Sequence, residues 1–109
     1  MANAYKILGQ SAPGAASDTD VYTVPAATES VISTIIVANR AASAGTFRIA
    51  LRPDGGAIAN SHYIAYDVPI AANDSTTLTL GITLNAADVV TVQCSSADMT
   101  VSIFGTEIS

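Results

Sequence analysis

Residues that carry chemistry are scarce in this sequence. It has one histidine, one cysteine and no tryptophan, and only 12% of its 109 residues are charged, about half the usual share. A zinc site needs about four nitrogen, sulfur or oxygen ligands, and a Cys/His catalytic pair needs an activated thiolate and an orienting group. The composition therefore predicts no catalytic residues, no metal and no cofactor, and hence a protein that is not an enzyme.

The single cysteine also excludes an internal disulfide. Cys94 falls in a strand-like run at the same parity as Val90 and Val92, so we expect a buried structural thiol rather than a reactive one. His62 stands at the start of another such run. Without partners for catalysis, it is expected to be a polar residue at a loop end or an interface, not a base.

Two pairs of side chains with oxygen ligands leave one question open. Asp18 and Asp20 in "SDTD", or Asn73 and Asp74 in "NDS", could contribute oxygens to a calcium ion. Neither pair has the dense ligand spacing of a recognised calcium loop. The other interpretation is that these side chains form turns through hydrogen bonds to the backbone.

Basic residues are few as well. Four Lys and Arg against nine Asp and Glu give a net charge of −5 and an isoelectric point near 4.3, without the basic footprint that nucleic-acid binding needs. No apolar run approaches the roughly twenty residues of a membrane span. The first ten residues lack the positive segment and the apolar core of a signal peptide. We therefore expect synthesis in a cytoplasm and no nucleic-acid or membrane partner.

What the sequence does have is a regular alternation typical of strands. Half of the residues are apolar, and Val, Ile and Thr dominate the apolar stretches. Clusters of Gly, Pro, Asn, Asp, Ser and Ala separate eight runs, at 5–10, 20–24, 30–39, 46–52, 62–68, 75–84, 88–94 and 99–108. Short strands at this spacing predict one domain over 1–109: an all-β, antiparallel β-sandwich, jelly-roll-like, with about eight strands.

Alternation also assigns faces to the runs. In 75–84, the shared parity places Leu78, Leu80, Ile82 and Leu84 on one face and the threonines on the other. By the same rule, Phe47, Ile49 and Leu51 share a face, and Met99, Val101 and Ile103 form an inner set. Gly81 and Gly105 stand inside strand patterns and indicate a bulge or a close approach of two backbones.

The run 30–39 is apolar at both parities, with Val31, Ile35 and Val37 on one and Ile32, Ile36 and Ala38 on the other. A central strand would explain this pattern. The other explanation is that a second subunit covers one face, which the low charge and the Ser/Thr/Ala-rich composition also favour. The sequence thus predicts a homo-oligomer.

The stretch from Arg52 to Asp67 contains the turn signal "PDGG" between two strand runs. If Arg52 faces Tyr63 across the pair, then Arg48 faces Asp67, and an arginine over a tyrosine could add a cation–π contact. This polar outer face and the 30–39 run are the predicted partner contacts: Arg48, Arg52, Tyr63, Asp67, Ile32 and Ile36.

Several segments of the sequence resemble those of a family of small virion proteins of tailed bacteriophages, including cyanophages. The similar phrases are "YKILGQSAP", "DVYTVPAATESVISTIIVANR", "TFRIALRPDG", "HYIAYDVPIAANDSTTLTLGITLNAADVVTVQ" and the closing "IFGTEIS". The resemblance covers nearly the whole chain and brings no catalytic residues with it.

This resemblance implies a capsid decoration (cement) protein on the outer surface of the phage head, where it would stabilise contacts between major capsid proteins. A trimer is the form expected on a hexameric lattice. The alternative is a tail-fibre or baseplate β-domain that acts in assembly or binds the host surface. A glycan-binding tail domain would need aromatic rings for sugar stacking, and the absence of tryptophan and the presence of only six Phe and Tyr weigh against it.

Overall fold

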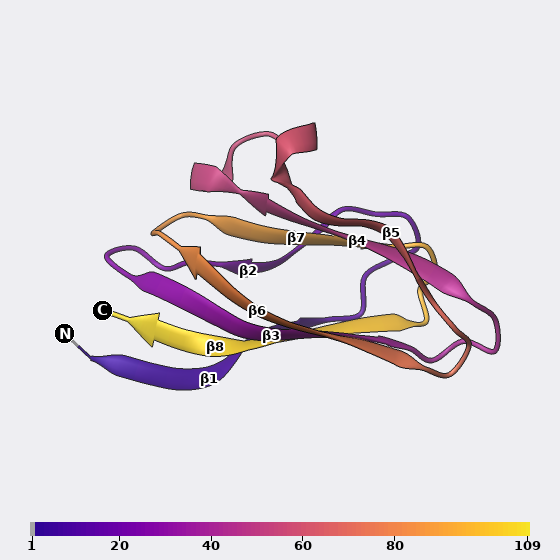
Figure 1. Cartoon of the computed structure of the whole chain (residues 1–109). Coiled ribbons are helices and arrows are strands. Elements are labelled where there is room, and N and C mark those ends of the chain that lie inside the picture. Colours follow the sequence, from indigo (N-terminus) through magenta and orange to yellow (C-terminus); the bar gives the residue numbers. More distant parts are fainter. Residues whose placement is uncertain (1) are drawn as a thin grey trace.

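A computed structural model describes residues 2–109, and these fold into eight strands and two short 3-10 turns (Figure 1). The strands are β1 (Asn3–Ser11), β2 (Thr19–Thr23), β3 (Glu29–Asn39), β4 (Gly45–Arg52), β5 (Tyr63–Ile70), β6 (Ser75–Leu84), β7 (Val89–Cys94) and β8 (Met99–Ile108). The turns η1 (Pro53–Gly55) and η2 (Asn60–His62) interrupt the connection from β4 to β5. Each of the eight predicted runs corresponds to one strand.

The strands form two four-stranded antiparallel sheets that pack face to face. Sheet A has the order β1-β8-β3-β6 and sheet B the order β2-β7-β4-β5. This interleaved order is that of an eight-stranded jelly roll, so the predicted fold class is confirmed. Figure 1 shows the two layers, with the η1–η2 segment at the far end of sheet B.

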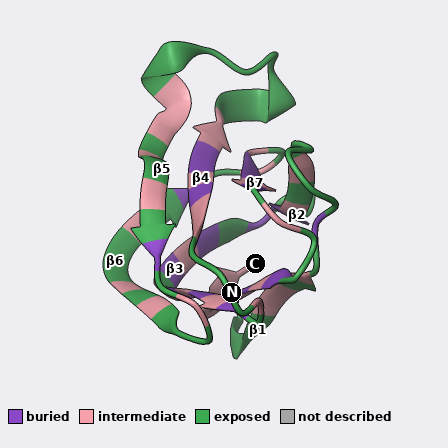
Figure 2. Cartoon of the chain, turned by 90° about the vertical axis from the view of Figure 1, so that its right-hand side faces the viewer, coloured by how far each residue is buried: buried purple, intermediate pink, exposed green. Residues whose placement is uncertain are grey.

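The core lies between the sheets and is built from alternate positions of both. Met99, Val101 and Ile103 of β8 are buried, as their alternation predicts, and they face Phe47 and Ile49 of β4 in one apolar cluster. In Figure 2 the buried positions are purple and lie on the strands, whereas the loop that carries η1 and η2 is largely green. Burial of this alternating set is the main stabilising contribution to the sandwich.

The predicted faces of β3 are wrong, because the strand contains a bulge. Ile32 pairs with Gly105 of β8, and Thr34 pairs with Phe104, so Ser33 is an extra residue that inverts the alternation after it. Ile32 and Ile35 are both fully buried in the core, although their parities differ. Ile32 is therefore not a partner contact, in contrast to the prediction.

The same bulge region explains the two glycines. A Cβ atom at Gly105 would collide with the backbone carbonyl oxygen of Val31, so the predicted close approach is confirmed there. Gly81 lies in the matching irregularity of β6, between the pairs Ile32–Ile82 and Thr34–Thr79. Leu80 stands in this bulge and is 36% exposed, so the prediction that it shares one face with Leu78, Ile82 and Leu84 is wrong.

Candidate interaction surface

A cluster of aromatic and charged side chains lies on the outer side of β4 and β5. Arg48 Nε donates a hydrogen bond to Asp67 Oδ1 at 2.7 Å, and its guanidinium carbon lies 4.0 Å from the centre of the Tyr66 ring. Tyr66 in turn meets Tyr63 edge to face, with ring centres 4.9 Å apart. These four residues, Arg48, Tyr63, Tyr66 and Asp67, are called the Arg48 cluster below.

The backbone of β5 sets this geometry. Phe47 pairs with Val68, which places Arg48 opposite Asp67 as predicted. Asp67 has a φ of 52°, in the left-handed region, and two register shifts follow toward the η2 end of the strand. The shifts bring Tyr63 opposite Ala50, so the predicted Arg52–Tyr63 pair is wrong.

The electrostatics of the cluster are those of a paired surface site. The hydrogen bond from the Arg48 guanidinium lowers the pKa of the Asp67 carboxyl, so this carboxyl is ionised well into acid conditions. Tyr66 remains 56% exposed and Ile64, beside it on β5, 45% exposed. A rigid cation held against open aromatic surface is the type of anchor that binding interfaces favour.

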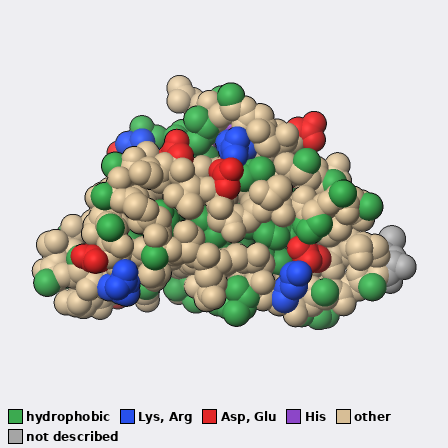
Figure 3. All heavy atoms as spheres, turned by 180° about the vertical axis from the view of Figure 1, so that it is seen from behind, with side chains coloured by type: hydrophobic (Ala, Val, Ile, Leu, Met, Phe, Trp, Pro, Cys, Tyr) green, Lys and Arg blue, Asp and Glu red, His purple; other side chains and the backbone are tan. Residues whose placement is uncertain are grey.

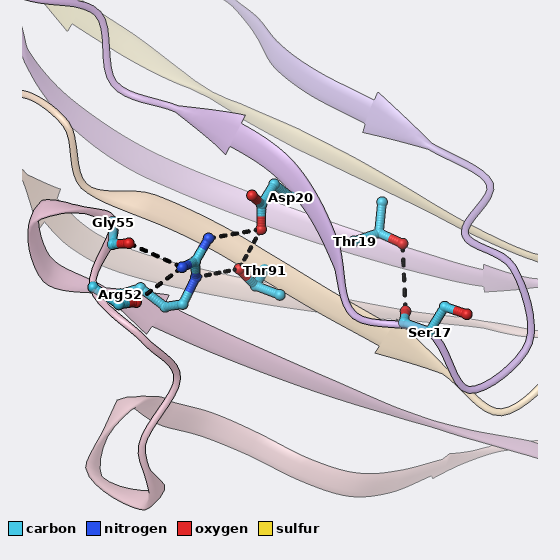
Figure 4. A network of polar contacts seen from close by, with 7 residues as sticks. Ser17, Thr19, Asp20, Arg52, Gly55 and Thr91 are labelled. Atoms are coloured by element: carbon cyan, nitrogen blue, oxygen red, sulfur yellow. Dashed lines mark hydrogen bonds and ion pairs between the residues drawn. The ribbon is translucent and has the colours of Figure 1, made fainter.

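Arg52, the other predicted contact of this face, is engaged inside the chain (Figure 4). Its Nη1 donates to the carbonyl oxygens of Gly55 and Gly56, at 3.1 and 2.8 Å. Its Nε donates to Thr91 Oγ1 and its Nη2 to Asp20 Oδ1, both at 2.9 Å. With its side chain only 16% exposed, Arg52 stabilises the β4–β5 connection and presents little surface to a partner.

This network also accounts for the acids considered as cation ligands. Asp20 accepts hydrogen bonds from Arg52 and from Thr91, and Asp18 accepts one from Gln93 Nε2 at 3.2 Å. Asp74 accepts a hydrogen bond from the backbone N–H of Ser75 at 2.8 Å. Within residues 2–109, no group of three or more His, Cys, Asp or Glu side chains is placed to hold a metal ion.

The histidine and the cysteine lie in different surroundings. His62 Nδ1 accepts a hydrogen bond from the backbone N–H of Ala59 at 3.1 Å, at the loop end where it was expected. Cys94 is fully buried in the core cluster, and this burial raises the pKa of its thiol from 9.0 to about 11. The prediction of a buried structural thiol is confirmed.

The outer face of sheet A is a second candidate surface. Of this face, the sequence pattern identified only residues of β3 as partner contacts. Its hydroxyl-bearing residues come from three strands: Thr34, Thr77, Thr79, Thr83, Thr100 and Ser102. Its apolar residues come from three strands as well: Tyr5, Ile7, Val31, Ile36, Ala38 and Phe104. Tyr5 and Ile7 are 80% and 51% exposed, and Ile36, one of the predicted contacts, also lies on this face.

Charge is almost absent from this outer face. Among residues 2–109, the acids and bases nearest to it lie at its margins: Glu29 at the first position of β3, Lys6 on the edge strand β1, and Arg40 and Asp74 beside Ala38 at the other end of β3. The Lys6 ammonium is held by Glu107 at 2.6 Å. A hollow of about 520 Å³ opens beside Tyr5, lined also by Ser33 and Phe104. Figure 3 shows the molecule from behind. Most of the charged side chains in this view lie in pairs of one red and one blue side chain, and uncharged surface separates the pairs.

A polar link that no sequence pattern indicates joins the two sheets. The Tyr22 hydroxyl of β2 donates to Glu107 Oε2 of β8 at 2.6 Å and lies 2.6 Å from Ser30 Oγ of β3. Burial and the hydrogen bond with Glu107 raise the pKa of Tyr22 from 10.0 to about 12. Hydrogen bonds from Lys6 and Tyr22 lower the pKa of Glu107. The link is structural, because all of its members are satisfied by one another.

No protein-family model matches the chain, and no curated protein is significantly similar to it. No helix in the described residues is long and apolar enough to cross a membrane.

Proposed function

We propose that this protein is a structural component of a tailed-phage virion, a capsid decoration protein that binds the outer surface of the head. The observation that carries the proposal is the Arg48 cluster: the exposed ring of Tyr66, the half-buried ring of Tyr63 beside it, and an arginine held in place by Asp67. The resemblance of several sequence segments to those of small virion proteins supports the same role.

The fold is compatible with this role and does not decide it. Jelly rolls occur in viral capsid domains, and they also occur in lectins and cupins. What favours a contact protein over a ligand-binding one is the surface chemistry. Tyr and Arg are enriched where binding energy concentrates in interfaces, whereas the acids at Asp18 and Asp20 already accept internal hydrogen bonds.

The proposed mechanism is many weak contacts repeated over a lattice. Arg48 is held in one orientation by Asp67 and Tyr66, so little side-chain entropy is lost when a partner packs against it. Each site would contribute modest affinity, and repetition on the shell would give avidity. Bridging of adjacent major capsid proteins would then oppose the outward pressure of packaged DNA.

The test is binding of the purified protein to heads of the phage that encodes it, prepared without this protein. We expect density over the icosahedral faces in electron micrographs. A variant with Arg48→Ala and Tyr66→Ala should bind the heads at least ~10-fold more weakly, which corresponds to about 1.4 kcal/mol or more.

Arg40→Ala is the matched control, because it removes the same side chain in the turn after β3. It should bind as the parent does. Density confined to the tail would overturn the head assignment in favour of a tail-fibre or baseplate domain. Normal binding by the Arg48→Ala/Tyr66→Ala variant would remove the Arg48 cluster from the contact.

A further inference from the structure

The outer face of sheet A has a composition that a water-facing sheet rarely shows. Antiparallel sheets with one solvated face usually present charged and polar residues there. Here the solvated face carries hydroxyl and apolar side chains, and Tyr5, at 80% exposure, is the most open large apolar residue among those described. Such a face is a candidate contact surface, and its chemistry indicates which partner fits it.

Hydroxyl groups make the face complementary to another copy of itself. Each Ser or Thr hydroxyl is both a donor and an acceptor, so two hydroxyl-rich surfaces can satisfy each other in more than one alignment. A surface of acids or bases lacks this property, because like charges repel. Thr77 and Thr79, both exposed on the edge strand β6, are examples of such groups.

The charge of the chain favours the same partner. Two copies that each carry a net charge of −5 repel one another over most of their surfaces. They can approach closely where acids are missing, and the middle of the outer face of sheet A is such a region, with Glu29 at one end and Asp74 at the other. This acidic chain thus has one broad face that a second copy can contact with little repulsion between carboxylates.

The available area is sufficient. Four strands spaced about 4.8 Å apart, each about 33 Å long, form a face of about 600 Å². Contact with a second copy over this area would bury about 1,200 Å² in total, which is the lower end of the range for specific, stable interfaces.

We infer that the outer face of sheet A is the surface through which copies of this chain associate, with Tyr5 and Phe104, beside the hollow toward the β1 edge, among its apolar contacts. This association involves a different face from the Arg48 cluster and does not depend on the capsid role.

Sedimentation equilibrium of the purified chain, without phage heads, tests the inference. The parent should form an oligomer whose mass gives its stoichiometry. A variant with Tyr5→Glu and Thr79→Glu places acids opposite one another in the contact and should raise the dissociation constant at least ~10-fold. Both side chains are exposed, so the variant should keep the circular dichroism spectrum of the parent.

Ile64→Glu is the matched control, since it introduces an acid at an exposed apolar position of β5 in sheet B. It should associate as the parent does. A parent that stays monomeric at all concentrations overturns the inference, and so does equal dissociation of the Ile64→Glu control. Because heads are absent, neither result bears on the proposed capsid binding.

Discussion

The outer faces of the two sheets expose different kinds of side chain to water. On sheet B, polar side chains are paired within the chain: Arg48 with Asp67, and Arg52 with Asp20. On sheet A, hydroxyl and apolar groups face outward with hardly any charge among them. The ion pairs of sheet B thus join different strands of that sheet, whereas the hydroxyl groups of Thr77, Thr79 and Thr83 on sheet A are exposed to solvent.

The strand edges show the same contrast. Sheet B ends in β2, which has five residues, and in β5, which carries Pro69 and the left-handed Asp67. Short strands, proline and bulges all hinder the pairing of an edge with another chain. Sheet A ends in the ten-residue β6, which has no charge and no proline and is interrupted only by the bulge at Gly81. The two edges of sheet B are thus better protected from pairing with another chain than the β6 edge of sheet A.

The largest expected effect tests whether sheet A depends on the close approach of two of its backbones. Gly105→Ala places a methyl group against the carbonyl of Val31, which would force β8 and β3 apart. We expect a loss of roughly 3 kcal/mol or more of unfolding free energy, measured by urea denaturation.

Gly81→Ala is the matched substitution in the same sheet, because a Cβ atom there meets nothing within 4 Å. It should change the unfolding free energy by less than about 1 kcal/mol. Equal losses in the two glycine variants would show that the bulge geometry tolerates a wider spacing of β3 and β8.

A smaller effect separates the two arginines of sheet B. Arg52→Ala leaves the carbonyls of Gly55 and Gly56 and the carboxylate of Asp20 without their donor, and should cost about 2 kcal/mol of unfolding free energy. Arg48→Ala breaks a more exposed ion pair and should cost clearly less. Denaturation of both variants in the same buffer checks the order, and a reversed order would contradict the assignment of Arg52 as the structural arginine.

The smallest expected effect concerns the link between the sheets and has a pH signature. Tyr22→Phe removes the hydroxyl that meets Glu107 and Ser30, and should cost roughly 1–2 kcal/mol at neutral pH. The pKa of Tyr22 is about 12 in the folded chain and 10.0 in its ordinary state, so folding favours the neutral phenol. Its stabilising contribution is therefore complete below pH 10 and is lost as the pH rises toward 12.

Cys94 acts in the same direction at slightly lower pH, because burial raises the pKa of its thiol from 9.0 to about 11. Denaturation curves between pH 8 and pH 12 should therefore show a continuous loss of stability in the parent. The Tyr22→Phe variant should lose less above pH 10 than the parent does. An identical slope in both proteins would mean that Tyr22 is not protected from ionisation.

The sequence was sufficient for the strands and for much of the core, because alternation is a local property. Met99, Val101 and Ile103 could be placed inside from their spacing alone. The bulge at Ser33 could not be foreseen, since it arises where β3 meets Gly105 of a strand some seventy residues away. This one extra residue moved Ile32 from the predicted surface into the core.

The candidate surfaces were predictable in proportion to how local they are. The Arg48–Asp67 pair follows from the register near the centre of the β4–β5 hairpin. The partner of Tyr63 was predicted wrongly, because bulges in β5 shift the register between Asp67 and Tyr63. The outer face of sheet A combines residues from β1, β3, β6 and β8, so it becomes visible only when the strand order is known.

That strand order has a consequence for how the chain matures during synthesis. β8 lies between β1 and β3, and β7 lies between β2 and β4, so each sheet receives one of its inner strands last. Until the ribosome has released those final segments, β1 and β2 have no neighbour to pair with in their own sheets. Most of the pairing is therefore long-range, and folding should be slow and complete only after β7 and β8 have been made. In the interval, the unpaired strands are exposed to aggregation.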